Sequence, residues 1–339
     1  MTEQQTNPMS VGLDDGYAVT KLALADGRLV AVPSRACLGR ASVTRIDNAE
    51  QHVFEYETDE QCYAVGDVDG EPTYFDGYPV SGLNRAIVQH ALQQAKLGGH
   101  SVHAVSGLPV GSFYHKDGSR RDALLDHKRA SLKRAVHPID GRLPAAIAFH
   151  EVIPEALAAW YDQVITESDG GVQLASERLD APVAIVDIGG RTTDVVVVAG
   201  QAVQHTASGS VRCGLLDVKR EVAEGISARF DLEVVSERCA DQAVHHGSVR
   251  LFGEDHDVTE LITRAQRQVV ERLHAETQRQ LGQGAELERV VFVGGGSVAL
   301  ADAIREWFPN QAMAEHPAFA NARGMLKYLR YVCETPSDG

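Results

Sequence analysis

Short apolar stretches alternate along the chain with longer stretches in which apolar residues recur every three or four positions. The short stretches are typical of strands, and the longer ones are typical of amphipathic helices. We expect strands at 11–14, 19–24, 29–32, 52–57, 62–66, 102–105, 145–152, 183–187, 194–200 and 290–293. We expect helices at 83–95, 121–135, 214–230, 236–244, 257–281 and 318–332, one opened by Pro154, and one from about Ala299. This mixed order predicts layered α/β domains.

Two hexapeptides in the two halves of the chain have the same plan. VGLDDG at 11–16 and AIVDIG at 184–189 each run from apolar residues through an aspartate to a glycine two positions later. Each is followed by a second stretch that is rich in strand-forming residues. This repetition predicts a duplicated domain.

Composition and charge restrict the class of protein. The 44% hydrophobic and 23% charged content is that of a globular chain, and the polar residues 1–10 read as a flexible leader. No apolar run reaches 18 residues, so we expect a cytoplasmic protein without a membrane partner. The net charge of -15 disfavours direct binding to DNA, although a local basic patch at 128–134 is an alternative. The spacing of the five cysteines indicates neither zinc nor a disulfide framework.

The second hexapeptide continues into a candidate phosphate-binding loop. An apolar strand delivers Asp187 at its carboxyl end, and Gly189 and Gly190 let backbone N–H groups approach an anion. Thr192 adds a hydroxyl donor. A carboxylate beside a phosphate cradle suits a Mg²⁺-nucleotide, whereas the competing interpretation is a plain Gly-Gly hairpin turn.

The first hexapeptide leads into a loop of the same kind. Gly16 permits close approach of a ligand, Asp14 or Asp15 can face the metal, and Lys21 can reach a phosphate from the return strand. An Asp-Asp-Gly hairpin turn is the alternative interpretation of this segment alone.

A third apolar strand also ends in glycines, Gly294, Gly295 and Gly296. Three glycines fit a flat surface on which a base or ribose can lie. The GxGxxG and GxxxxGK[ST] patterns are absent, which disfavours a nicotinamide dehydrogenase and a P-loop enzyme.

The three loops, in this order and spacing, resemble those of the actin superfamily. The segment VIPEALAAWYD at 152–162 and the basic stretch DHKRASLKR at 126–134 look like those of its plasmid-segregation members, the ParM/StbA family. The resemblance implies an α/β, duplicated, ribonuclease H-like two-lobe ATPase fold with nucleotide in the cleft between the domains. It implies a domain I of residues 11–165 plus 318–334 and a domain II of residues 166–317.

The resemblance also assigns roles to residues. Asp14 and Asp187 take water-mediated Mg²⁺ contacts, and Glu155, at the start of the helix between the domains, orients or activates the attacking water. The expected nucleotide contacts are Asp15, Gly16, Tyr17, Lys21, Gly189, Gly190, Thr192, Gly214, Gly294, Gly295 and Gly296. Gln266 and Arg267 are weaker candidates for the adenine.

Two residues depart from the pattern of that family. Tyr17 stands where many relatives have Ser or Thr, and Arg191 replaces a small residue. An arginine at 191 either tightens phosphate binding or points to solvent.

The resemblance implies an ATPase, with GTP left open, that polymerises into filaments. It would move plasmid DNA only indirectly, through a DNA-binding adaptor of the ParR type. The alternatives are a small-molecule kinase and a nucleotide-sensing regulator of the same superfamily.

Overall fold

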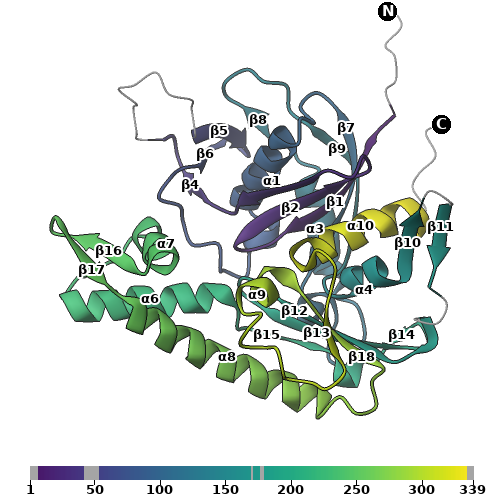
Figure 1. Cartoon of the computed structure of the whole chain (residues 1–339). Helices are drawn as coiled ribbons and strands as arrows, with labels where there is room; N and C mark the ends of the chain where they lie inside the picture. Colours follow the sequence, from purple (N-terminus) through teal and green to yellow (C-terminus); the bar gives the residue numbers. More distant parts are fainter. Residues whose placement is uncertain (1–6, 42–52, 169–170, 176–178, 334–339) are drawn as a thin grey trace, which may run out of the picture.

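Two mixed sheets form the centre of the molecule in the computed structural model, which describes residues 7–41, 53–168, 171–175 and 179–333 (Figure 1). The first sheet has the order β3 (Leu29–Pro33), β2 (Val19–Leu24), β1 (Met9–Asp15), β7 (Ser101–Leu108), β9 (Ala146–Pro154). The second has the order β14 (Ala202–Val203), β13 (Thr193–Ala199), β12 (Val183–Ile188), β18 (Arg289–Val293), β19 (Gln311–Met313), and β15 (Gly209–Val211) also pairs with β13.

The second sheet repeats the first in order and direction. In each, the central strand pairs antiparallel with the strand that follows it in the chain and parallel with a strand from a later crossover. In the hairpin β1–β2, Asp14 lies opposite Lys21, and in the hairpin β12–β13, Asp187 lies opposite Asp194. The duplication expected from the two hexapeptides is confirmed.

The outer faces of the sheets are covered by separate sets of elements. Helix α1 (Gly82–Gln94) packs on the first sheet, beside a small sheet of β4 (Ala36–Leu38), β6 (Gln61–Gly66), β5 (Val53–Thr58) and β8 (His137–Pro138). The second sheet is covered by α6 (Leu215–Phe230), α7 (Glu237–His246) and α8 (Thr259–Leu281). We call the first group with its sheet and α3 (Asp122–Leu132) lobe I, and the second group with its sheet and α9 (Gly294–Ala299) lobe II.

The remaining elements are short. They are α2 (Val110–Phe113), the hairpin β10 (Ile165–Ser168) and β11 (Gly171–Leu174), the hairpin β16 (Ser248–Leu251) and β17 (Glu254–Asp257), and the 3₁₀ turns Tyr78–Val80, His205–Ala207 and Pro317–Phe319. Among the residues that the structure describes, no helix combines the length and the apolar character needed to cross a bilayer.

Two helices lie between the sheets and join the lobes (Figure 1). Apolar residues of α4 (Leu157–Val164) pack on the inner face of the second sheet, and those of α10 (Ala320–Tyr331) pack against the first. The helices touch each other at Gly324, where a Cβ atom would lie 1.7 Å from the carbonyl oxygen of Ala158. Any side chain at Gly324 would force the helices apart, so the positions of α4 and α10 are coupled.

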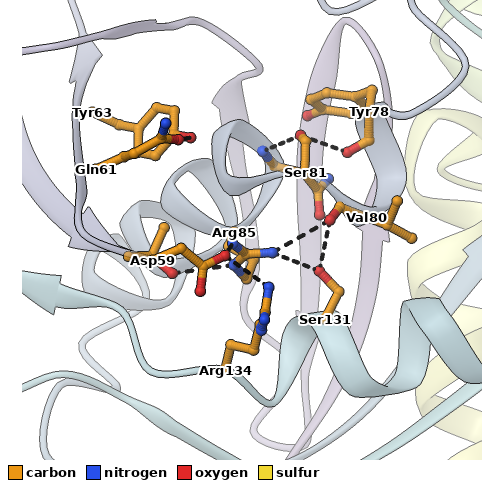
Figure 2. Close-up of polar contacts among 11 residues, drawn as sticks. Asp59, Gln61, Tyr63, Tyr78, Val80, Ser81, Arg85, Ser131 and Arg134 are labelled. Carbon is orange, nitrogen blue, oxygen red and sulfur yellow. Dashed lines mark hydrogen bonds and ion pairs between the residues drawn. The ribbon is translucent and has the colours of Figure 1, made fainter.

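Within lobe I, a buried arginine fixes the β5–β6 hairpin to α1 and α3. Figure 2 shows Arg85 of α1 between Asp59 in the hairpin turn and Ser131 of α3. Arg85 donates to the Ser131 hydroxyl at 2.8 Å and pairs with Asp59, which also binds Arg134 at 2.8 Å. The guanidinium therefore links three elements that are distant in sequence.

Most expected elements are found within a few residues of their predicted ends, but three predictions are wrong. Pro154 does not open a helix: it ends β9, opposite Leu108, and α4 begins only at Leu157. Since β9 is an edge strand, a residue without N–H costs it no ladder bond. Met9 and Ser10 do not belong to a flexible leader, because they already pair with β7. The helix from Ala299 is also displaced, since α9 ends there. Residue 52 and residues 1–6 and 334–339 lie outside the described residues.

Candidate functional site in the interlobe cleft

Acidic side chains from both lobes meet where β1, β9 and β12 end. Asp14 is the next-to-last residue of β1, Asp187 is the next-to-last residue of β12, and Glu155 follows the last residue of β9. Burial raises the pKa of Glu155 well above its usual range, and the charges of Asp194, Asp14 and Asp187 raise it further. The sequence-predicted catalytic residues Asp14, Glu155 and Asp187 are therefore brought into one cluster.

The two aspartates of the first loop have different partners. Asp14 accepts a 3.0 Å hydrogen bond from Lys21. Asp15 is buried, and its carboxylate is bound by Lys128 at 2.8 and 3.0 Å and by Asn84 at 3.0 Å. Asp15 thus points into lobe I, and Asp14 is the aspartate that belongs to the acidic cluster.

The second loop has an aspartate that the sequence analysis missed. Asp194 accepts hydrogen bonds from the Val110 N–H at 2.8 Å, from the Ser210 hydroxyl and from the Thr192 hydroxyl at 3.1 Å. Burial raises the pKa of Asp194 to about 6 despite these donors. The sequence offered one signal for Asp194, which is an aspartate at the start of the apolar stretch DVVVVAG. In the hairpin, this aspartate lies opposite Asp187.

The two glycine loops are in direct contact. A Cβ atom at Gly190 would lie 2.7 Å from the Cβ of Ala18 in the first loop, and one at Gly16 would lie 2.9 Å from the Val19 carbonyl oxygen. Gly189 closes a tight turn by donating to the Thr192 carbonyl at 2.9 Å. The two lobes are therefore in direct contact where these loops meet.

Helix α6 starts on the second loop. Leu215 and Leu216 donate to the carbonyls of Gly189 and Gly190 at 3.1 and 2.8 Å. A Cβ at Gly214 would lie 2.5 Å from the Gly190 carbonyl oxygen, which explains the glycine there.

The glycines after β18 form the first turn of α9 instead of a flat loop. Gly294, with φ +88°, presses on β12: a Cβ there would lie 2.2 Å from Oδ1 of Asp187. A Cβ at Gly296 would lie 2.4 Å from the Ile188 side chain, whereas one at Gly295 would meet no other atom of the described residues within 4 Å. Gly294 and Gly296 are therefore required by the close approach of α9 to the end of β12.

A cavity of about 470 Å³ lies between the lobes beside the first loop. Its walls include Tyr17, Thr73, Leu216, Lys219, Gln266 and Leu300. Lys219 pairs with Asp241 at 3.2 Å and with Glu237, both in α7. Gln266 lines both this cavity and a neighbouring surface hollow, whereas Arg267 lines only the hollow, with Asp302.

Ion pairs cross from lobe I to lobe II over this cleft. Arg191 lies over the Tyr17 ring at 5.2 Å and pairs with Asp76 at 2.6 Å, and Arg212 reaches the same carboxylate at 3.2 Å. Arg191 is 15% exposed and so does not simply point to solvent. Farther along, Arg35 pairs with Asp241 and Arg238 with Asp67.

The residues fit a Mg²⁺-nucleotide better than a metal held by protein alone. Among the described residues, no group of three or more His, Cys, Asp or Glu side chains could hold a metal ion. Burial and the charges of Asp14 and Asp194 raise the pKa of Asp187 to about 7, which indicates negative charge that the protein leaves unbalanced. Mg²⁺ usually keeps several waters and takes one or two carboxylates plus phosphate oxygens.

The basic stretch 126–134 is not a free cationic surface. Lys128 is buried against Asp15, Arg129 pairs with Asp126 and Glu151, and Arg134 pairs with Asp59. Lys128 is therefore not available to bind DNA, which argues against a DNA-binding patch in this stretch.

Two family models match the sequence. Residues 9–165 match the N-terminal model of plasmid segregation protein ParM (StbA), and residues 185–306 match the C-terminal model of archaeal MreB-like actin homologues. The chain is therefore similar to ParM/StbA proteins over residues 9–165 and to archaeal MreB-like actin homologues over residues 185–306. No curated protein matches it.

Solved structures share this ParM-like fold over nearly the whole chain. An archaeal actin homologue has a TM-score of 0.73 at 20% identity, covering 95% of this chain and 99% of its own. A 15-stranded ParM filament from Clostridium botulinum has a TM-score of 0.74 at 18% identity, with 96% and 99% covered. The archaeal homologue in complex with ADP has a TM-score of 0.72 at 21% identity, with 95% and 99% covered. The expected actin-like two-lobe fold is confirmed.

Proposed function

We propose that this ParM-like protein is a Mg²⁺-dependent nucleoside triphosphatase that uses ATP. The observation that carries the proposal is the meeting of Asp14, Glu155 and Asp187 beside two glycine loops from opposite lobes. Phosphoryl transfer requires mainly positioning and charge neutralisation, with one group to orient the water. The ADP complex of the archaeal homologue supports a nucleotide in this cleft.

Each residue then has one task. Asp14 and Asp187 would hold the metal's waters, and Lys21, Gly16, Gly189, Gly190 and Thr192 would contact the phosphates. Bound Mg²⁺ supplies positive charge that neutralises the transferring phosphoryl group. Glu155, whose pKa is raised, would accept a proton from the attacking water as a general base. The 470 Å³ cavity would take the nucleoside, between Tyr17, Leu215 and Ala299 at the end of α9.

We also propose that the protein assembles into filaments that segregate plasmid DNA through a ParR-type adaptor. The ParM model match and the ParM filament among similar structures support self-assembly. The net charge of -15 supports an indirect link to DNA. The proposed domain I comprises 11–165 plus 318–334 and domain II 166–317, which agrees with the packing of α10 on the first sheet.

Two variants test the triphosphatase. Asp187→Ala should abolish Mg²⁺-ATP binding in calorimetric titration while the circular dichroism spectrum is retained. Glu155→Ala should bind ATP and polymerise, but should release phosphate roughly 10²–10⁴-fold more slowly. Asp302→Ala, in which a highly exposed side chain is removed, is the matched control. Unchanged ATP affinity in Asp187→Ala, or phosphate release at the wild-type rate in Glu155→Ala, would contradict the assignments.

Light scattering with ATP and Mg²⁺ tests assembly. A rise with ATP that decays as phosphate is released would support filaments. Hydrolysis without any rise, across a range of protein concentrations, would favour a non-polymerising kinase or a nucleotide-sensing regulator. A gel-shift at physiological salt should show no DNA retained by the protein alone.

A further inference from the structure

The side chain of Asn321 bridges the two halves of the acidic cluster. Asn321 is the second residue of α10 and is only 5% exposed. Its Nδ2 donates to Oδ2 of Asp187 at 2.6 Å, and its Oδ1 accepts from the backbone N–H of Ala156 at 3.1 Å. The ionised carboxylate can only accept and the N–H can only donate, so the two partners fix the orientation of the amide.

The turn that Asn321 holds carries Glu155 and is strained. Ala156 has φ +60° and ψ -41°, a conformation that an alanine rarely adopts, and its side chain is fully buried. Such a conformation persists only where the surroundings over-determine it. Glu155 N–H donates to the Leu108 carbonyl at 2.8 Å and Leu157 N–H to that of Glu155 at 2.7 Å.

Among the hydrogen bonds found in this turn, the Asn321 bond is the one made by a side chain from another element. Helix α10 is itself fixed against α4 at Gly324. A movement of Asp187 relative to lobe I would therefore be transmitted through Asn321 to Ala156, the residue that follows Glu155.

We propose that Asn321 is a positioning residue that holds Glu155 at a fixed position relative to Asp187 across the two lobes. This inference rests on the proposed triphosphatase activity. Asn321 would contact neither phosphate nor nucleoside, so it would act through its two partners. The alternative role is purely structural, in which the amide only satisfies two buried polar groups.

The two roles predict different kinetics. A misplacement of about 1 Å at a reacting group can reduce a rate roughly 10²-fold, while binding contacts elsewhere are kept. A positioning role therefore predicts a lower kcat with little change in nucleotide affinity. A structural role predicts a loss of stability, with affinity and rate falling together or not at all.

Three variants separate the roles. Asn321→Leu removes both bonds at similar volume, whereas Asn321→Asp keeps an acceptor for Ala156 N–H but loses the donor to Asp187. Arg330→Ala, on the exposed side of α10, is the control. The measurements are ATP affinity by calorimetry, single-turnover phosphate release, and hydrogen exchange at the Ala156 amide in nucleotide-free protein.

We expect Asn321→Leu to release phosphate roughly 10- to 100-fold more slowly, with ATP affinity within about threefold of wild type. Exchange at Ala156 should accelerate in Asn321→Leu and stay slow in Asn321→Asp. Wild-type release in a folded Asn321→Leu protein would overturn the inference, as would parallel loss of affinity and rate. If the wild type hydrolyses no nucleotide, the proposed function fails and this inference fails with it.

Discussion

The ammonium group of Lys128 lies 2.8 Å from Oδ1 of Asp15, and both side chains are almost completely buried, at 2% and 1% exposed. The same ammonium donates to the carbonyl oxygen of Gly107 at 2.5 Å. A Cβ at Gly107 would lie 2.6 Å from Cγ of Glu155. The pair therefore neutralises Asp15 and supports the strand against which Glu155 packs.

Lys128→Met should destabilise the protein by about 3–5 kcal/mol, because it leaves the Asp15 carboxylate buried without a counter-ion. Burial already raises the pKa of Asp15, and Lys128 acts in the opposite sense. Chemical denaturation measures the loss. Lys133→Met, at the exposed end of α3, should change stability by under 1 kcal/mol. Equal stability of the two variants would contradict this account.

Nucleotide-free protein should lose stability as pH rises through the range in which Asp187 and Asp194 ionise. Their folded pKa values of about 7 and about 6 are above the usual 3.8, so between pH 4 and 7 the folded state binds more protons than the unfolded state. Asp187→Asn cannot ionise there. Its Tm relative to wild type should therefore increase by a few °C between pH 5.5 and 8 in calorimetric scans. A constant difference in Tm would show that Asp187 is not perturbed.

Substitution of neighbouring glycines in α9 should give opposite results. Gly294→Ala would place a methyl 2.2 Å from Asp187 at a φ of +88°, so we expect lower stability and loss of Mg²⁺-ATP binding. Gly295→Ala meets no described atom within 4 Å and should fold with unchanged Tm. Calorimetry on both variants tests this, and weaker ATP binding by Gly295→Ala would support its predicted nucleoside contact. A stable, ATP-binding Gly294→Ala protein would be inconsistent with the packing.

Asp76→Ala should speed nucleotide release, because it removes the ion pairs by which Arg191 and Arg212 of lobe II bind this carboxylate across the cleft. We expect a several-fold faster dissociation of a fluorescent ATP analogue in stopped-flow experiments. Raised salt should accelerate release from the wild type more than from the variant, since screening weakens exposed pairs. Asp302→Ala serves as the control for loss of an exposed acid. Equal salt dependence in all three proteins would exclude a role for this contact.

The sequence could predict those site residues that belong to a short, recognisable pattern of neighbouring residues. A strand followed by aspartate and glycine predicted Asp14 and Asp187 as site residues, and the two aspartates occupy equivalent places in two hairpins of the duplicated fold. Lys128 and Asn321 gave no such signal, because their partners lie 113 and 134 positions away in the sequence. In an isolated helix pattern, a lysine or asparagine reads as part of a solvated face.

The prediction of a flat loop at residues 294–296 was wrong for a different reason. Glycine disfavours helices by about 1 kcal/mol per residue relative to alanine, so local propensity predicts a loop. Packing against the end of β12 outweighs that preference, because only residues without a side chain fit at positions 294 and 296. Tertiary contact therefore determines α9.

The duplicated hairpins are alike in backbone but differ in charge, since the facing pair is an ion pair in lobe I and two acids in lobe II. Where lobe I places Lys21 across from Asp14, lobe II places Asp194 across from Asp187. If the two hairpins carried the same charges, the electrostatic potential would be equal at both, and the two ends of an elongated anion would bind equally well in either direction. With a cation in one and an extra acid in the other, the cleft is electrically polar. Under the proposed function, a phosphate chain that enters the cleft would have a preferred direction, with its most negative end attracted toward Lys21 and repelled by Asp194.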